Sequence, residues 1–222
     1  MVIARRFVGL ILLLTFCLLP RPTADAQSPA VVTILHFNDV YEIGPIEAGH
    51  YGGLSRVATV LKQLKRSNAP VLSVLAGDYL SPSAIGTAVI DGEPLGGRQM
   101  VDVLNAVGLD WATFGNHEFD VSLQSFLARN AQGHFHLVTS NVTDANGELF
   151  PNTVRSAIVP VRAGGRTIHL GLIGLTIDAN KQPWVRYAPP IPSAQEALKG
   201  LEGQVDGEIG RASCRERVSY HV

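Results

Sequence analysis

The sequence has 222 residues, of which 46% are hydrophobic and 17% are charged, and its formal net charge is −1. A chain this rich in apolar residues can bury a core and need not be disordered. The near-zero net charge gives no general electrostatic reason to bind nucleic acid or an anionic membrane surface. Any anionic substrate must therefore be held by local groups, and we expect no nucleic acid as a partner.

The first 26 residues predict a signal peptide that is removed on export. Two arginines precede an apolar run from Phe7 to Leu19, and residues 24–26 have the small-x-small form of a cleavage site. A membrane anchor is the alternative, but this run is shorter than the roughly 20 residues that span a bilayer. We therefore expect a periplasmic or extracellular protein with no stable membrane anchor.

Beyond the signal peptide, short β-branched runs alternate with amphipathic segments, which is the pattern of strands alternating with covering helices. The expected strands are 31–37, 71–76, 111–114 and 136–140, and the expected helices are 54–66, 97–107 and 123–131. The first helix shows the pattern clearly, because its apolar residues recur at helical spacing. Those apolar residues are expected to pack into the core.

The pattern changes after Asn141 to a β-hairpin, with strands at 157–161 and 167–175, which is expected to start a second sheet. Ser193 is expected to cap a last helix that ends near Gly203. These elements predict an α/β (α+β) sandwich of two sheets flanked by helices.

One partial domain is expected over residues 30–205. Residues 206–222 show neither helical nor strand periodicity. We expect no strand there, and we interpret this segment as an unrelated tail produced by a truncation artefact. The C-terminal part of the fold would then be missing.

Three short polar motifs follow three successive strands. They are Asn38-Asp39, Gly77-Asp78 and the run Gly-Asn-His-Glu-Phe-Asp at 115–120. In an open α/β sheet, ligands gather at the carboxyl ends of the strands. The motifs are therefore expected to meet at one edge of the sheet, where Gly77 would allow a tight turn.

Carboxylates, an amide oxygen and imidazoles form a ligand set suited to Mn²⁺, Zn²⁺, Mg²⁺ or Fe rather than to soft metals. A shared aspartate can bridge two ions about 3.5–4 Å apart, the spacing at which a metal pair clamps a phosphoryl displacement. Asp78 is the candidate bridge. We therefore expect two divalent metal ions as cofactors.

The run 115–120 is the most specific of these signals. With Leu35-His-Phe-Asn-Asp39 and the Gly-Asp pair before it, the chain resembles the calcineurin-like metallophosphoesterases, whose pattern is D-x-H, then G-D, then G-N-H-[DE]. The match is closest to the 5′-nucleotidase and UDP-sugar hydrolase branch, and it covers roughly residues 31–203. The resemblance implies hydrolysis of phosphate esters, in particular nucleotides, by a hydroxide that two metals activate.

The resemblance also implies a role for each matching position. Asp39 would bind the first metal, Asp78 would bridge both metals, and Asn116 would bind the second. His117 would face the scissile phosphate, stabilise developing charge and help the leaving group depart. Asp120 would pair with His117 and orient its imidazole.

The sequence departs from the family pattern at Tyr41, where the family has a metal-binding histidine. A phenol with an ordinary pKa of about 10 is a poorer ligand than imidazole, so the first metal site is expected to be weaker or differently formed. Glu42 or His50 could substitute for the missing ligand. Asn141, at the end of the fourth expected strand, could line the substrate pocket.

The family also supplies a histidine from the strand after the last helix, a Gly-His-x-His motif and a C-terminal domain that grips the nucleoside, and we interpret the sequence as passing into the unrelated tail before it reaches any of them. We therefore expect the complete gene product to be a phosphoesterase, and the 222-residue form to be inactive or nearly so. We expect a monomer.

Two alternatives remain. A non-catalytic binding or scaffold domain with a degenerate metal site is favoured by Tyr41, and hydrolysis of a sulfur ester could use the same metal scaffold. The remaining histidines are expected to lie on the surface or to pack within the fold rather than to bind a metal. Trp111 and Trp184 are expected to pack in the core or in a loop rather than to stack on a base.

Overall fold

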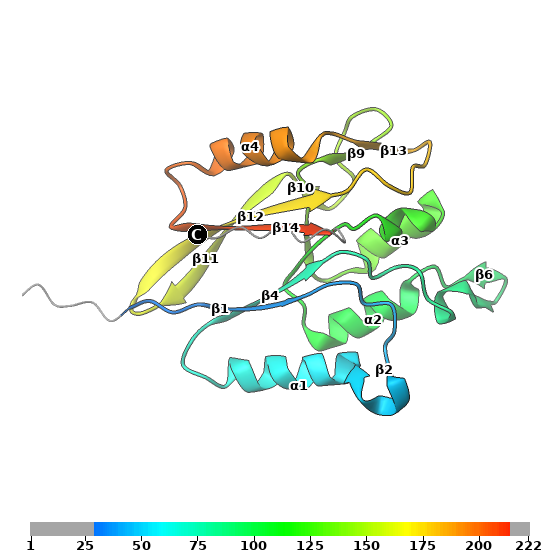
Figure 1. The fold of residues 1–222 in the computed structure, drawn as a ribbon, viewed down its shortest axis with the longest axis horizontal. Coiled ribbons are helices and arrows are strands. Elements are labelled where there is room, and N and C mark those ends of the chain that lie inside the picture. Colours follow the sequence, from blue (N-terminus) through cyan, green and yellow to red (C-terminus); the bar gives the residue numbers. More distant parts are fainter. Residues whose placement is uncertain (1–28, 214–222) are drawn as a thin grey trace, which may run out of the picture.

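The computed structural model describes residues 29–213 (Figure 1). The predicted signal peptide at 1–26 and the segment 214–222 of the predicted tail lie outside the described residues. Within residues 29–213, no helix has both the length and the apolar character needed to cross a membrane.

The first sheet has five strands in the order β1-β4-β7-β8-β10, and every neighbouring pair is parallel. Its strands are β1 (Thr33–Phe37), β4 (Val71–Ala76), β7 (Trp111–Thr113), β8 (His136–Val138) and β10 (Thr153–Val154). Parallel neighbours need long crossover connections, and the first three of these contain helices, whereas the connection from β8 to β10 does not. The helices are α1 (Leu54–Lys65), α2 (Arg98–Val107) and α3 (Leu123–Gln132). The four predicted strands and three predicted helices of this region are confirmed, with ends that differ by at most two residues.

A second sheet of three strands packs against the first. Its strands are β11 (Ser156–Ala163), β12 (Arg166–Thr176) and β14 (Gly207–Ser213), and β12 lies in the middle. Leu72 and Val74 of the first sheet form one buried cluster with Leu172 of the second. Figure 1 shows α1 and α2 on one side of this sandwich and α4 (Pro190–Leu201) on the other. The predicted two-sheet α/β sandwich is therefore confirmed.

Strand β14 corrects the expectation that no strand follows the last helix. Residues 207–213 pair in parallel with β12. A strand can form without apolar alternation when its backbone groups find a partner strand, and Ile209 supplies one apolar contact to the buried cluster. The proposed domain boundary near residue 205 and the truncation stay predictions.

The prediction that Ser193 caps α4 is wrong. The helix begins at Pro190, and Ser193 lies inside its first turn with its hydroxyl donating to the Pro189 carbonyl at 2.8 Å. A proline suits the first helical position because its fixed φ already matches the helix and its missing N–H would have no partner there.

Short elements connect this framework. They are β2 (Pro45–Ile46), η1 (Glu47–Gly49), β3 (Tyr51–Gly52), η2 (Ile85–Thr87), β5 (Val89–Ile90), β6 (Glu93–Pro94), η3 (His117–Asp120), β9 (Val142–Asp144) and β13 (Val185–Tyr187).

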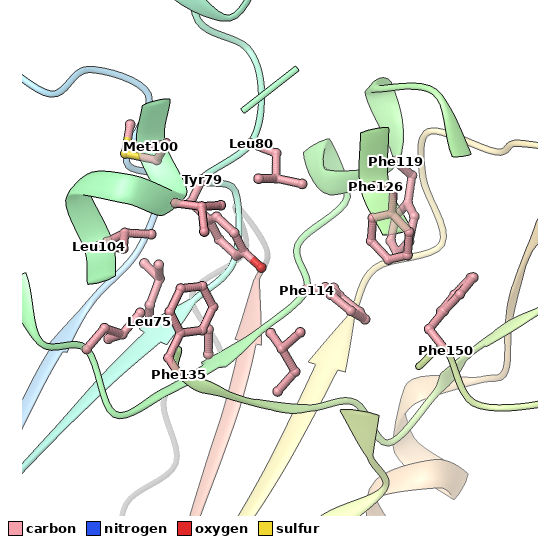
Figure 2. Packing of buried hydrophobic residues seen from close by; sticks show 14 of the residues in the cluster. Leu75, Tyr79, Leu80, Met100, Leu104, Phe114, Phe119, Phe126, Phe135 and Phe150 are labelled. Atoms are coloured by element: carbon pink, nitrogen blue, oxygen red, sulfur yellow. The ribbon is translucent and has the colours of Figure 1, made fainter. Parts of the chain in front are cut away.

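The core between the first sheet and its helices is rich in aromatic side chains. Figure 2 shows Phe119 and Phe126 close together, with Phe114 and Phe150 on either side of them. The ring of Trp184 lies 5.3 Å from that of Phe126. The packing role predicted for Trp184 is therefore confirmed, and Phe119 anchors η3 in this aromatic cluster.

Candidate active site

The predicted site residues follow three neighbouring parallel strands. Asp39 lies two residues after β1, Asp78 two residues after β4, and Asn116 three residues after β7. Because parallel strands place their carboxyl ends at the same edge of the sheet, the three turns lie side by side. Asp39 and Asp78 both adopt a left-handed backbone, with φ of 55° and 60°. Such a conformation is costly for a residue with a side chain and often occurs at functional sites.

Tyr41 links the two aspartates. Its phenol oxygen lies 2.8 Å from Asp39 Oδ1 and 3.3 Å from Asp78 Oδ2. A phenol has a single hydrogen, so it donates to one carboxylate at a time. The structure therefore brings Asp39 and Asp78 within the reach of one hydroxyl group, and it places Tyr41 between them.

Burial and neighbouring acidic groups shift the pKa values of Asp78 and Tyr41. Burial raises the pKa of Asp78, and the neighbouring Asp39 raises it further, although the backbone N–H of His117 donates to Asp78 Oδ1 at 2.9 Å and acts in the opposite direction. Burial and the hydrogen bond to Asp39 raise the pKa of Tyr41. Tyr41 is therefore a neutral hydrogen-bond donor at neutral pH.

His117 and Asp120 form the predicted pair, because His117 Nδ1 lies 2.6 Å from Asp120 Oδ2. Burial by itself would lower the pKa of His117. The hydrogen bond to Asp120 and the negative charges of Asp78, Asp120 and Glu118 outweigh that effect and raise the pKa. His117 therefore keeps its proton to a higher pH than an ordinary histidine.

Asn180 contacts both residues of this pair, and it was not predicted from the sequence. Its side-chain amide donates to Asp120 Oδ1 at 2.7 Å and lies 3.2 Å from His117 Nδ1. The residue lies in the loop after β12, where no motif marks it. Its backbone is left-handed, with φ of 53°, a conformation that asparagine tolerates better than most residues, but this becomes visible only in the structure.

Glu118 is the second residue that sequence reasoning missed. Its carboxylate is fully buried and accepts the backbone N–H groups of Asp78 at 2.8 Å and Tyr79 at 2.7 Å. Burial raises its pKa to about 7, and the charge of Asp78 adds to that rise. The residue lies inside the predicted motif, but three of its four backbone partners are 38–40 positions away along the chain.

A cavity of about 560 Å³ adjoins the pair and is lined by Glu42 and Asp120, among other residues. Glu42 therefore lies near the site, whereas His50 lies on the exposed surface beside η1.

Asn141 is 2% exposed, and its amide donates to the carbonyls of Thr176 and Ala188. That placement favours a structural role over the predicted place in a substrate pocket.

The donors at this edge fit part of a divalent metal site. Two carboxylates and the amide of Asn116 are hard or borderline oxygen donors. The pKa of Asp78 is raised chiefly by burial and further by Asp39, and a nearby cation would favour its ionised form. Within residues 29–213, however, no three His, Cys, Asp or Glu side chains gather closely enough to hold a metal ion. The described residues thus provide an incomplete ligand set.

Comparison with known proteins adds an independent view. A family model described as calcineurin-like phosphoesterase matches residues 32–197. Snake venom 5′-nucleotidase from Gloydius brevicauda is 28% identical over 188 residues, which cover 77% of this chain and 30% of that protein.

Solved structures agree with that match. The 5′-nucleotidase precursor from Thermus thermophilus has a TM-score of 0.67 at 25% identity, covering 82% of this chain and 36% of that chain. The calcineurin-like phosphoesterase YfkN from Bacillus subtilis has a TM-score of 0.66 at 20% identity, covering 87% of this chain and 65% of that chain, and it supports the fold alone.

The matched region covers only 30% of the venom nucleotidase, so the match does not show that this chain has the activity of a whole nucleotidase. The family model nevertheless covers most of the sequence, including all three polar motifs. This chain therefore belongs to the calcineurin-like phosphoesterase family.

Proposed function

We propose that this chain carries part of the active site of an enzyme that hydrolyses phosphate esters of nucleotides with the help of two divalent metal ions. The observation that carries the proposal is the gathering of Asp39, Asp78 and the His117–Asp120 pair at one edge of a parallel sheet. Relatives named 5′-nucleotidases favour nucleotides as the substrate class.

Each residue has a proposed role. Asp39, Asp78 and Asn116 would hold the metal ions, for which Mn²⁺, Zn²⁺, Mg²⁺ and Fe remain the candidates. Calcineurin-like phosphoesterases use divalent metal ions, which when bound activate water and neutralise charge on the phosphate. Protonated His117, oriented by Asp120, would stabilise charge on the phosphate and give a proton to the leaving oxygen.

We also propose that the protein is exported, because residues 1–26 have the pattern of a signal peptide and one relative is named a snake venom enzyme. A monomeric state stays a prediction.

Metal binding by the 222-residue chain is the first test. We expect titration calorimetry to show Mn²⁺ binding that Asp78→Asn removes. The matched control is Asp91→Asn, because Asp91 is an exposed aspartate with a similar left-handed backbone, φ 54°. Equal binding by the wild type and both variants would exclude Asp78 as a ligand.

Turnover is the second test. The locus would be sequenced past the codon for Val205, and any longer product that this reveals would be tested with nucleoside monophosphates and Mn²⁺. We expect hydrolysis that His117→Ala lowers by roughly 10²–10⁴-fold, whereas His134→Ala at an exposed position leaves it unchanged. Two bound metals without phosphatase activity would favour a sulfur ester as the substrate instead.

A non-catalytic binding domain is the second candidate, and one observation favours it. Tyr41 places its hydroxyl against both carboxylates, where a metal ligand would otherwise be expected. A longer product that binds one metal ion or none, and hydrolyses nothing, would support this candidate over the enzyme.

A further inference from the structure

Glu118 has no part in the reaction proposed above, yet its carboxylate is buried beside the site with an exposed fraction of 0%. A charge buried this deeply is costly unless it is well hydrogen-bonded. The described contacts supply that compensation from the backbone. One oxygen accepts the N–H groups of Tyr79 and Leu80, at 2.7 and 3.1 Å, and the other accepts those of Asp78, at 2.8 Å, and Gly115.

These four N–H groups come from two different turns. Three belong to the turn after β4, which carries Asp78, and one belongs to the turn after β7, which leads into Asn116 and His117. A further hydrogen bond runs from the backbone of the second turn to a side chain of the first, because the N–H of His117 donates to Asp78 Oδ1 at 2.9 Å. The backbone of the turn after β4 therefore binds the side chain of Glu118, and the backbone of the turn after β7 binds the side chain of Asp78.

The two turns carry different parts of the chemistry. Asp78 is a proposed metal ligand, whereas His117 is proposed to act on the leaving group, so the reaction needs a fixed spacing between them. Pairing of β4 with β7 fixes the register of the two strands as far as Ala76 and Thr113, but this pairing does not extend to the turns that follow them. A shared acceptor that is bonded to both turns holds them at one spacing.

We infer that Glu118 is a positioning residue that holds the Asp78 turn and the Gly115–His117 turn in one register. This inference rests on the proposed function only for the roles of Asp78 and His117. The hydrogen bonds themselves are independent of any reaction.

The test uses the 222-residue chain and the variant Glu118→Gln. Glutamine keeps the shape of the side chain but replaces one acceptor oxygen with an NH₂ group, which would face N–H donors. The control is Glu148→Gln, the same change at an exposed glutamate. Two properties are compared: the amide proton shifts of Asp78, Tyr79, Leu80 and Gly115 in ¹H–¹⁵N spectra, and the affinity for Mn²⁺.

We expect Glu118→Gln to move these amide resonances upfield and to weaken Mn²⁺ binding by roughly 10- to 100-fold, the usual effect of removing a partner that orients a metal ligand. Glu148→Gln should change neither. A folded Glu118→Gln chain with unmoved amides and unchanged Mn²⁺ affinity would overturn the inference.

A second measurement decides the question if Glu118→Gln does not fold. Hydrogen exchange of the wild-type chain should be much slower at the four amides than at exposed Asp91, and exchange as fast as that of Asp91 would overturn the inference. If the wild type binds no Mn²⁺, the metal site of the proposed function fails, while the amide shifts and the exchange rates still test Glu118 alone.

Discussion

Gly77 and Gly115 lie in direct backbone contact, since a β-carbon added to Gly77 would come within 2.2 Å of the Gly115 nitrogen. Gly77 also has φ of +75°, a conformation that residues with a side chain rarely adopt. The contact brings the turn after β4 against the turn after β7. It therefore allows Asp78 to meet the backbone of His117 at 2.9 Å.

Replacing Gly77 with alanine should destabilise the protein by about 2–5 kcal/mol, because the strain of the left-handed backbone and the overlap with Gly115 add together. Urea denaturation measures the change. Gly147→Ala is the matched control, since Gly147 has φ of +88° and open space around it, and it should cost only about 1–2 kcal/mol. Equal costs at the two positions would contradict the importance of the contact.

The framework of the first sheet could be predicted because its signals are local. Apolar runs and helical stripes mark four of its five strands and its three covering helices, whereas the two-residue strand β10 was not predicted, and the three polar motifs mark the ends of β1, β4 and β7. The sequence thus placed Asp39, Asp78 and the His117–Asp120 pair at one edge, and the structure brings them together.

The remaining features depend on distant partners. Strand β14 forms because β12 offers a free edge, which no pattern within residues 207–213 reveals. Asn180 reaches Asp120 across 60 positions, and Glu118 binds a turn about 40 positions earlier. Contacts of this kind follow from the packed fold, so reasoning on a single sequence does not find them.

Replacing Phe126 with alanine should lower the free energy of unfolding by about 3–5 kcal/mol, because the change leaves a cavity in the aromatic core. Phe126 is 0% exposed, and its ring lies 4.9 Å from that of Phe150 and 5.3 Å from that of Trp184. Denaturation followed by tryptophan fluorescence tests this value. Leu123→Ala on the same helix, where the side chain is 37% exposed, should cost less than about 1 kcal/mol.

Removing the side chain of Asn180 should disturb Asp120. Glycine is the suitable replacement because Asn180 has φ of 53°, so Asn180→Gly adds no backbone strain. We expect a loss of about 1 kcal/mol in stability, the usual value of one hydrogen bond, and a shifted His117 ring resonance. Asn152→Gly is the control, at an exposed position with φ of 64°, and it should leave that resonance in place. Identical spectra for the two variants would argue against the role of Asn180.

Asp120→Asn should lower the pKa of His117, because it removes the hydrogen-bonded negative charge that outweighs burial. A raised folded-state pKa gives stability that is complete below the unfolded value of about 6.5 and is lost as pH rises through the folded value. The variant should therefore lose more stability at about pH 5.5 than at about pH 8.

An NMR titration of the His117 ring, with denaturation at both pH values, tests this expectation. Asp206→Asn is the control, since Asp206 lies 3.7 Å from His169 and should not affect His117. An unchanged His117 titration in Asp120→Asn would show that Asp120 does not set its charge.

Replacing Tyr41 with histidine should strengthen metal binding. The phenol oxygen lies within hydrogen-bonding distance of both Asp39 and Asp78, so the change removes a competing donor from the two carboxylates and adds a nitrogen donor beside them. We expect Mn²⁺ or Zn²⁺ to bind at least about tenfold more tightly, which corresponds to about 1.4 kcal/mol, in a calorimetric titration.

Two further variants separate the causes of that gain. Tyr41→Phe removes the hydroxyl without adding a ligand, so it reports the effect of freeing the carboxylates alone. Tyr51→His adds an imidazole at a position that is 62% exposed, so it reports non-specific binding by a surface histidine. If Tyr51→His matched Tyr41→His, the gain would not come from the site. If Tyr41→Phe matched it, the phenol would act mainly by occupying the carboxylates, because the imidazole would then contribute nothing as a ligand.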